Sequence, residues 1–306
     1  MSRPLKTPHG RAVDIRHSSN GTKMAILYET KCIIDNSVVA LSLSEGSIGL
    51  KLAFAPESSS GGVLAVAHTP SHITILQETA PGVWVQKQVL ESDLVPEVVT
   101  DMCFARVGSR LAVACGTGTI SLYSAKEGSE YEPYHKEPDI DIPTDMVANK
   151  ASTTTSRKAV SERMITAVCW GDDGSSRPSM VCGDESGAVT LVEPYLDRNW
   201  NLIALPMPPK PSGVLCVSCA PSLGRTLHML AVGCRDGRMV LAVLKSPHFV
   251  VHHTGIAACY RCEWSPCGSL LAGAFADDTI LIWSVTTKCH SDGTYAPVLE
   301  LMKTDQ

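Results

Sequence analysis

The chain has 306 residues, of which 44% are hydrophobic and 19% charged, a composition typical of a globular protein with a sizeable core. A net charge of -5 and the lack of any Lys/Arg block argue against direct binding to nucleic acid or an anionic membrane. The N-terminus lacks the apolar stretch of a signal peptide, and no run approaches the roughly 20 apolar residues of a membrane span. We therefore expect the twelve cysteines to be reduced thiols of a cytosolic or nuclear protein.

Three apolar runs separated by turns recur along the chain. A weak first copy, RAVDIRHSSNGTKMAILYETKCIID, places Asn20-Gly21 in its first turn. Each of five clearer copies begins with a run in which apolar and polar residues alternate, followed by a polar turn. A run of small apolar residues such as LAVA comes next, and then a tight turn and a third run. These copies read IGLKLAFAPESSSGGVLAVAHTPSHITILQE, VVTDMCFARVGSRLAVACGTGTISLYS, MITAVCWGDDGSSRPSMVCGDESGAVTLVE, GVLCVSCAPSLGRTLHMLAVGCRDGRMVLAV and CYRCEWSPCGSLLAGAFADDTILIWS.

The alternation has a period of two, which predicts β-strands. A fourth strand fits after five of the copies, as VVALSLS, VWVQKQVL, WNLIAL, HFVVHH and PVLELM. We expect the fourth strand of copy three within residues 131–142. Four antiparallel strands repeated every roughly 40–50 residues predict an all-β, six-bladed β-propeller of the WD40 type. We expect one domain, 1–306, with blades at about 11–44, 47–91, 98–142, 164–206, 212–253 and 256–303.

The segment 124–163 departs from this pattern. It is polar, with SAKEGSEYEPYHKEPD followed by NKASTTTSRK, and it predicts an extended, mobile insertion after the third blade. Two interpretations remain for it: a solvated loop, or a loop that binds a partner or is phosphorylated.

Acidic side chains recur at one place in the repeat. They occupy the turn between the second and third strands, as Asp184-Glu185, Asp236 and Asp277-Asp278. Recurrence by position indicates turn residues rather than a general acid and base. The glycines of GTGT at 116–119 lie in the same turn, without the strand–helix unit of a phosphate loop.

Two further features resemble sites. The pairs Cys216/Cys219 and Cys259/Cys262 form a CxxC…CxxC pattern that suits zinc. Each pair would lie on one strand, however, where positions i and i+3 face opposite sides, so we expect strand thiols and no metal. His228 starts a second strand, which favours a packing or turn role. Because the chain also lacks GxSxG and HExxH motifs, we expect no catalytic residue, cofactor or enzymatic activity.

The blade count raises the question of ring closure. A WD40 ring commonly closes because the start of the chain supplies the outer strand of the last blade. Here all six blades supply their own four strands, so no extra strand is left to close the ring in this way. Either the six blades close directly, or the ring is open and exposes strand edges between blades one and six. Exposed edges invite strand addition by another chain. The sequence thus suggests a scaffold completed by a blade from a partner.

The fifth copy carries a distinctive first turn. The motifs of copy five are Ala220-Pro221, Leu223-Gly224-Arg225, His228 and Leu230-Ala231. Copy four adds Trp170, Ser175-Ser176-Arg177 and Pro178. Together these motifs resemble those of the Seh-type nucleoporins, relatives of the Sec-thirteen coat propeller. The Gly-His and Trp-Asp signatures are mostly absent, and Trp283 is what remains of the latter.

This resemblance implies an open propeller that receives a blade from an α-solenoid nucleoporin. It places the chain in the Y-shaped outer ring of the nuclear pore, at the nuclear envelope, in transport of protein and mRNA and beside other outer-ring nucleoporins. A vesicle coat, a coat-like nutrient-signalling complex at the vacuolar or lysosomal surface, and a generic WD40 adaptor remain alternatives. The residues implied to contact the partner flank the gap: Ala12, Val13, Asp14 and Ile15 on blade one, and Tyr260, Cys262, Trp264, Val298, Leu299 and Leu301 on blade six.

Overall fold

The structure is a computed structural model, and all of its regular secondary structure in the described residues is β-strand. The described residues are 12–18, 20–35, 37–39, 47–56, 62–69, 71–91, 98–105, 110–125, 133–143, 163–171, 178–195, 199–208, 212–221, 228–244, 249–253, 257–289 and 295–302. The chain divides into two compact units, one of Met1–Cys115 and Ser121–Asp139, the other of Gly116–Ile120 and Ile140–Gln306.

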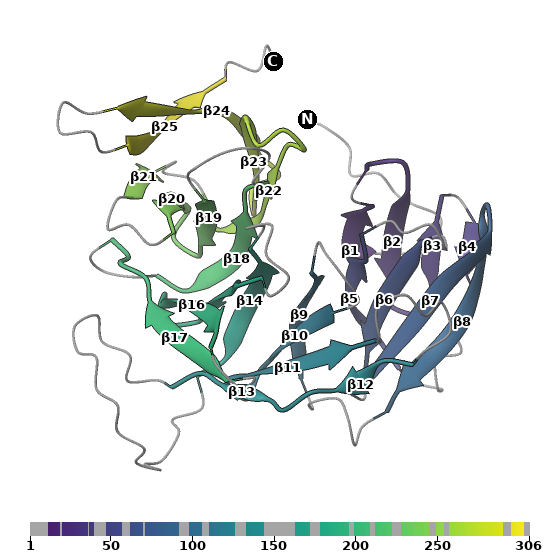
Figure 1. Cartoon of the computed structure of the whole chain (residues 1–306). Helices are drawn as coiled ribbons and strands as arrows, with labels where there is room; N and C mark the ends of the chain where they lie inside the picture. The colour runs from purple at the N-terminus through teal and green to yellow at the C-terminus, as the bar shows by residue number, and fades with distance from the viewer. Residues whose placement is uncertain are drawn as a thin grey trace. The chain divides into compact units, whose positions relative to one another are not determined.

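The first two sheets each contain four consecutive antiparallel strands (Figure 1). Sheet one comprises β1 (Ala12–His17), β2 (Met24–Tyr28), β3 (Cys32–Ile34) and β4 (Ser37–Val39). Sheet two comprises β5 (Gly49–Phe54), β6 (Val63–His68), β7 (His72–Ala80) and β8 (Val83–Leu90).

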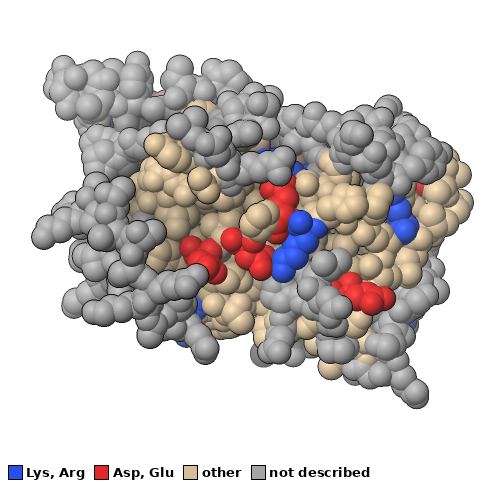
Figure 2. Space-filling model, turned by 60° about the horizontal axis from the view of Figure 1, so that its bottom comes forward, with Lys and Arg blue, Asp and Glu red and all other residues tan. Residues whose placement is uncertain are grey.

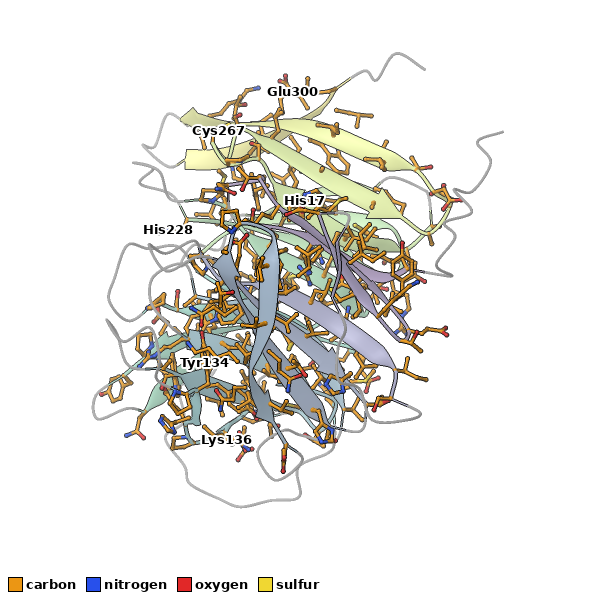
Figure 3. The ribbon with its side chains drawn as sticks, turned by 90° about the vertical axis from the view of Figure 1, so that its right-hand side faces the viewer. His17, Tyr134, Lys136, His228, Cys267 and Glu300 are labelled. Carbon is orange, nitrogen blue, oxygen red and sulfur yellow. The ribbon has the colours of Figure 1, made fainter. Side chains whose placement is uncertain are left out.

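The third sheet is irregular at its fourth position. It contains β9 (Val99–Phe104), β10 (Arg110–Cys115) and β11 (Thr119–Ser124), and β11 pairs with two short strands, β12 (His135–Lys136) and β13 (Ile140–Asp141). Just before β12, the backbone of Tyr134 (Figure 3) exchanges two hydrogen bonds with the side chain of Gln88, at 2.7 and 3.1 Å. Part of the polar segment 124–163 therefore belongs to this sheet, whereas 126–132 and 144–162 lie outside the described residues.

The last three sheets repeat the four-strand order. Sheet four contains β14 (Ile165–Trp170), β15 (Met180–Asp184), β16 (Val189–Pro194) and β17 (Trp200–Ala204). Sheet five contains β18 (Val214–Cys219), β19 (Met229–Cys234), β20 (Arg238–Val243) and β21 (Phe249–His253). Sheet six contains β22 (Cys259–Trp264), β23 (Leu270–Phe275), β24 (Ile280–Cys289) and β25 (Tyr295–Leu301). The predicted all-β chain of six antiparallel blades is confirmed.

A β-bulge interrupts the first strand of every sheet. In each case the register shifts between the first and third residues of the strand, so that one extra residue faces the second strand. A bulge turns a side chain away from the regular alternation. The extra residues are Val13, Leu50, Thr100, Thr166, Leu215 and Tyr260.

The core lies between the faces of neighbouring sheets. In the first unit, separate apolar clusters join sheet one to sheet two and sheet two to sheet three. In the second unit, similar clusters join sheet four to sheet five and sheet five to sheet six. The second and third strands of sheet five are buried along their whole length, because both of their faces are covered. This explains the small-apolar runs in the second strands.

The acidic residues that recur in the sequence are turn residues, as predicted. Asp184 Oδ1 accepts hydrogen bonds from the backbone NH groups of Ser186 and Ala188 at 2.9 and 3.0 Å. Asp236 and Asp277 accept equivalent bonds from the NH groups two residues further on, each at 3.2 Å. A side chain that bonds to its own turn fixes the tight connection between the second and third strands.

Candidate interaction surfaces

Sheet one presents an exposed face opposite the one that packs on sheet two. Cross-strand partners share a face, and Ile15 pairs with Ile26 while Met24 pairs with His17. Ile15 is 46% exposed and Met24 37% exposed. We define Ile15, His17, Met24 and Ile26 as the exposed face of sheet one.

The predicted contact residues of β1 fall into two groups. Ala12, Val13 and Ile15 are exposed. Asp14 instead faces the interior of the first unit, where its Oδ2 accepts a hydrogen bond from the backbone NH of Leu52 at 2.9 Å. Arg16 lies 3.3 Å from Asp14 and 3.1 Å from Asp101, so a charged network ties the first strands of sheets one and three. Asp14 thus already has contacts within the chain.

Sheet six also presents an exposed face. Arg261 pairs with Ala274, which pairs with Ile280, and Glu263 pairs with Ala272, which pairs with Ile282. Ile280 is 62% exposed, and Arg261 donates to Glu263 from Nε at 3.0 Å. We define these six residues as the exposed face of sheet six: Arg261, Glu263, Ala272, Ala274, Ile280 and Ile282.

The contact residues predicted on sheet six are also split by the structure. Tyr260 is the bulge residue and is 61% exposed, and Val298 is on the side of the exposed face. Cys262 is buried, and Leu299 packs on the cluster between sheets five and six. Trp264 also packs on that cluster, and its Nε1 donates a hydrogen bond to the Ser218 carbonyl at 2.9 Å. Leu301 is exposed at the end of β25.

Sequence reasoning missed the two isoleucines of the exposed face. Ile280 and Ile282 alternate with Leu281 and Trp283 in the string ILIW, so both faces of β24 are apolar. A strand that is apolar on both faces is typical of a sheet covered on both sides. That signal was present in the sequence and pointed to this surface.

The cysteine pairs follow two different geometries. In β18, Cys216 packs between sheets five and six, whereas Cys219 packs between sheets four and five, on opposite faces as predicted. The prediction is wrong for Cys259 and Cys262, which share the cluster between sheets five and six. The bulge at Tyr260 adds one residue between them and reverses the alternation. Among the described residues, no group of three or more His, Cys, Asp or Glu could hold a metal ion.

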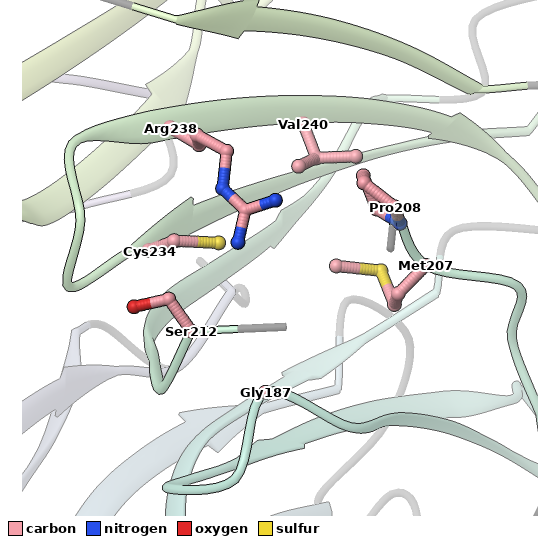
Figure 4. A pocket seen from close by; sticks show the side chains of 7 residues that line it. All are labelled: Gly187, Met207, Pro208, Ser212, Cys234, Arg238 and Val240. Atoms are coloured by element: carbon pink, nitrogen blue, oxygen red, sulfur yellow. The ribbon is translucent and has the colours of Figure 1, made fainter. Parts of the chain in front are cut away.

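A small pocket lies between turns and strands of sheets four and five (Figure 4). Arg238 enters it and donates from Nε to Asp236 Oδ2 at 2.7 Å, so an ion pair already engages the guanidinium. His228 (Figure 3) directly precedes β19, and its carbonyl accepts a hydrogen bond from Leu244 at 2.8 Å. The residues that line the pocket are Gly187, Met207, Pro208, Ser212, Cys234, Arg238 and Val240.

Charged side chains of both signs are visible on one face of the chain (Figure 2). On the face shown in Figure 2, acidic and basic side chains are interspersed among uncharged ones over the described residues. Within that part of the chain, no helix is long and apolar enough to span a membrane.

Comparison with known families identifies a repeat in the last part of the chain. Residues 245–284 match the WD40 family, described as WD domain, G-beta repeat. The match covers β21 of sheet five, β22 and β23 of sheet six, and β24 as far as Ser284. Six antiparallel sheets with a WD40 repeat are consistent with the predicted WD40-type β-propeller. Comparison with curated proteins gives no match.

Proposed function

We propose that this chain is a WD40-type scaffold subunit that binds β-structure donated by an α-solenoid partner. The observation that carries the proposal is the exposed apolar face of sheet six, centred on Ile280 and Ile282. Exposed apolar patches rimmed by polar groups mark protein interaction sites. Here Arg261 and Glu263 supply the polar rim.

The physics of such binding is that of sheet packing. An added blade would bury Ile280 and the alanines of β23, which removes apolar surface from water. Main-chain hydrogen bonds along an added strand give affinity, and alternate side chains give specificity. The exposed face of sheet one, with Ile15 and Met24, offers a second surface of the same chemistry.

The finer assignment rests on the resemblance to the Seh-type nucleoporins. We propose that the partner is an α-solenoid nucleoporin and that the pair belongs to the outer ring of the nuclear pore at the nuclear envelope. Two of the motifs that carry the resemblance, Leu223-Gly224-Arg225 and Ser175-Ser176-Arg177, lie outside the described residues. The ring opening between blades one and six stays a prediction.

A non-enzymatic role without cofactor or metal is part of the proposal. WD40 domains serve as scaffolds and adaptors, and the repeat at 245–284 favours that class. A vesicle coat and a coat-like nutrient-signalling complex use the same propeller type, and a closed WD40 adaptor would instead bind a peptide without receiving a blade. These three are the competing outcomes of the test below.

The test begins with affinity capture of the tagged full chain and identification of the captured proteins by mass spectrometry. The α-solenoid protein identified in this way is then co-expressed with the chain. We expect outer-ring nucleoporins and a tag signal at the nuclear rim. Ile280→Glu places a charge on the exposed face and should reduce recovery of the solenoid at least about tenfold. Ile203→Glu is the matched control, because Ile203 is also exposed, at 36%, but lies on β17.

Distinct outcomes contradict distinct parts of the proposal. Recovery of components of a vesicle coat, or of a coat-like nutrient-signalling complex, without nucleoporins would reject the pore assignment but keep the scaffold. A stable monomer that captures no solenoid, or equal losses with Ile280→Glu and Ile203→Glu, would reject binding through sheet six.

A further inference from the structure

Two cysteines from different sheets are in contact within the second unit. The Sγ atoms of Cys169 and Cys219 are 3.3 Å apart, although the residues are 50 positions apart in the sequence. Cys169 is buried in the cluster between sheets four and five, and Cys219 is partly exposed at the end of β18. Two thiols in contact, one of which solvent can reach, form a pair that an external oxidant can link.

The strands that carry the pair are neighbours over their length. β14 and β18 lie side by side (Figure 1). Near the start of both strands, the Thr166 hydroxyl donates to the Val214 carbonyl at 2.6 Å. Cys169 and Cys219 meet near the other end, so the strands run in the same direction. The Thr166 bond holds the two strands together at one end, and a disulfide at the other end requires the sulfurs to close from 3.3 Å to roughly 2.05 Å.

We propose that Cys169 and Cys219 are an oxidation site that forms a disulfide between sheets four and five. The oxidant is a low-molecular-weight disulfide, RSSR. The Cys219 thiolate attacks one sulfur of RSSR, whose S–S bond breaks to release RS⁻ and leave a mixed disulfide on Cys219. The Cys169 thiolate then attacks Cys219 Sγ and displaces the second RS⁻. Two protein thiols are oxidised, RSSR is reduced to two RSH, and the two protons pass to the released thiolates.

The other close thiols in this unit have a different setting. Cys216 and Cys259 are both buried between sheets five and six, where an external oxidant has no direct access. A hydrogen bond with Cys216 and burial raise the pKa of the Cys259 thiol, which disfavours the reactive thiolate. Cys267, in contrast, is exposed in the turn between β22 and β23, so it can accept a mixed disulfide.

The link would close a loop of 50 residues and join two blades covalently. Such a loop constrains the unfolded chain, so oxidation should raise the melting temperature by roughly 5 °C, and a dithiol reductant should reverse the rise. This outcome does not depend on the proposed scaffold function.

The experiment treats the native full chain with oxidised glutathione, blocks remaining thiols by alkylation, and digests the protein without reduction. Fragmentation in the mass spectrometer identifies which cysteines are joined. We expect a Cys169–Cys219 link and the higher melting temperature in wild type and in Cys267→Ser. Cys219→Ser should show neither. Three results would overturn the proposal: both thiols alkylated after oxidation, Cys219 held as a stable mixed disulfide, or either cysteine linked elsewhere.

Discussion

The carboxylate of Asp14 accepts a hydrogen bond from the backbone NH of Leu52 at 2.9 Å, which joins β1 of sheet one to β5 of sheet two. The same carboxylate lies 3.3 Å from the Arg16 guanidinium. One side chain therefore neutralises a cation and satisfies a backbone donor that sheet pairing does not use. Both interactions are inside the first unit.

Asp14→Ala should lower the free energy of unfolding by about 2 kcal/mol, because it leaves the Leu52 NH and part of the Arg16 charge without their acceptor. Asp14→Asn keeps an acceptor oxygen and should lose less. Denaturant titration of both variants measures the difference. Equal losses for Ala and Asn would show that charge, rather than the bond to Leu52, carries the effect.

Gly233 lies against two thiols. A Cβ at this position would be 2.5 Å from Cys216 Sγ and 2.7 Å from Cys259 Sγ, closer than van der Waals contact allows. Gly233→Ala should therefore destabilise the chain by about 2 kcal/mol through overpacking. Because Cys216→Ala removes one of the clashing atoms, the double variant should lose less than the sum of the two single losses. Additive losses in thermal or urea unfolding would contradict this account.

The blade pattern could be predicted from the sequence because turns and alternating runs are local signals. The tight turns at Asp184, Asp236 and Asp277 occur where the repeat places them. Two short strands take the place of the fourth strand of sheet three. Their residues show little alternation of apolar and polar side chains, so the sequence gives little indication of them.

The direction of individual side chains could not be predicted in the same way. A bulge in every first strand adds one residue, so counting positions assigns the wrong face to residues on either side of it. Cys262 and Trp264 consequently point toward sheet five instead of outward. Asp14 likewise accepts a hydrogen bond from Leu52, which is 38 residues away in the sequence. No local sequence pattern predicts such a long-range contact.

His68 is a buried histidine at the end of β6. Its Nε2 lies 3.0 Å from Thr74 Oγ1, and its ring stacks on that of His72 with centroids 5.5 Å apart. Burial lowers the pKa of His68 below its usual 6.5; a bond with the backbone of Thr69 opposes the shift, and His72 adds to it. The unfolded chain thus takes up a proton at higher pH than the folded chain.

The free energy of unfolding should therefore be fully retained above about pH 7 and fall as the pH drops through 6.5 toward the lower pKa of the folded state. Urea titrations between neutral and mildly acidic pH measure this slope. His68→Gln removes the titrating group and should flatten this slope. His135→Gln is the control, because His135 is exposed, and it should leave the slope unchanged. A slope that persists in His68→Gln would assign the pH dependence to other groups.

Cys267 lies in the exposed turn between β22 and β23 (Figure 3). Hydrogen bonds with the hydroxyls of Ser265 and Ser269, whose oxygens are 3.3 and 2.9 Å from its sulfur, lower the pKa of the thiol to about 7. The thiolate is the form that reacts with alkylating reagents, so the rate should reach half of its plateau near pH 7. Cys219 is only partly exposed, so the reagent should reach it and modify it more slowly.

Removal of the hydroxyls tests the cause of this reactivity. Ser265→Ala or Ser269→Ala should shift the midpoint of the rate profile to higher pH and slow alkylation of Cys267 at pH 7, with the double variant slowest. Ser284→Ala lies on β24 of the same sheet and serves as the control, with no expected shift. Rates are measured for each cysteine by mass spectrometry after short exposure to iodoacetamide. An unchanged midpoint in the double variant would mean that the serines do not stabilise the Cys267 thiolate.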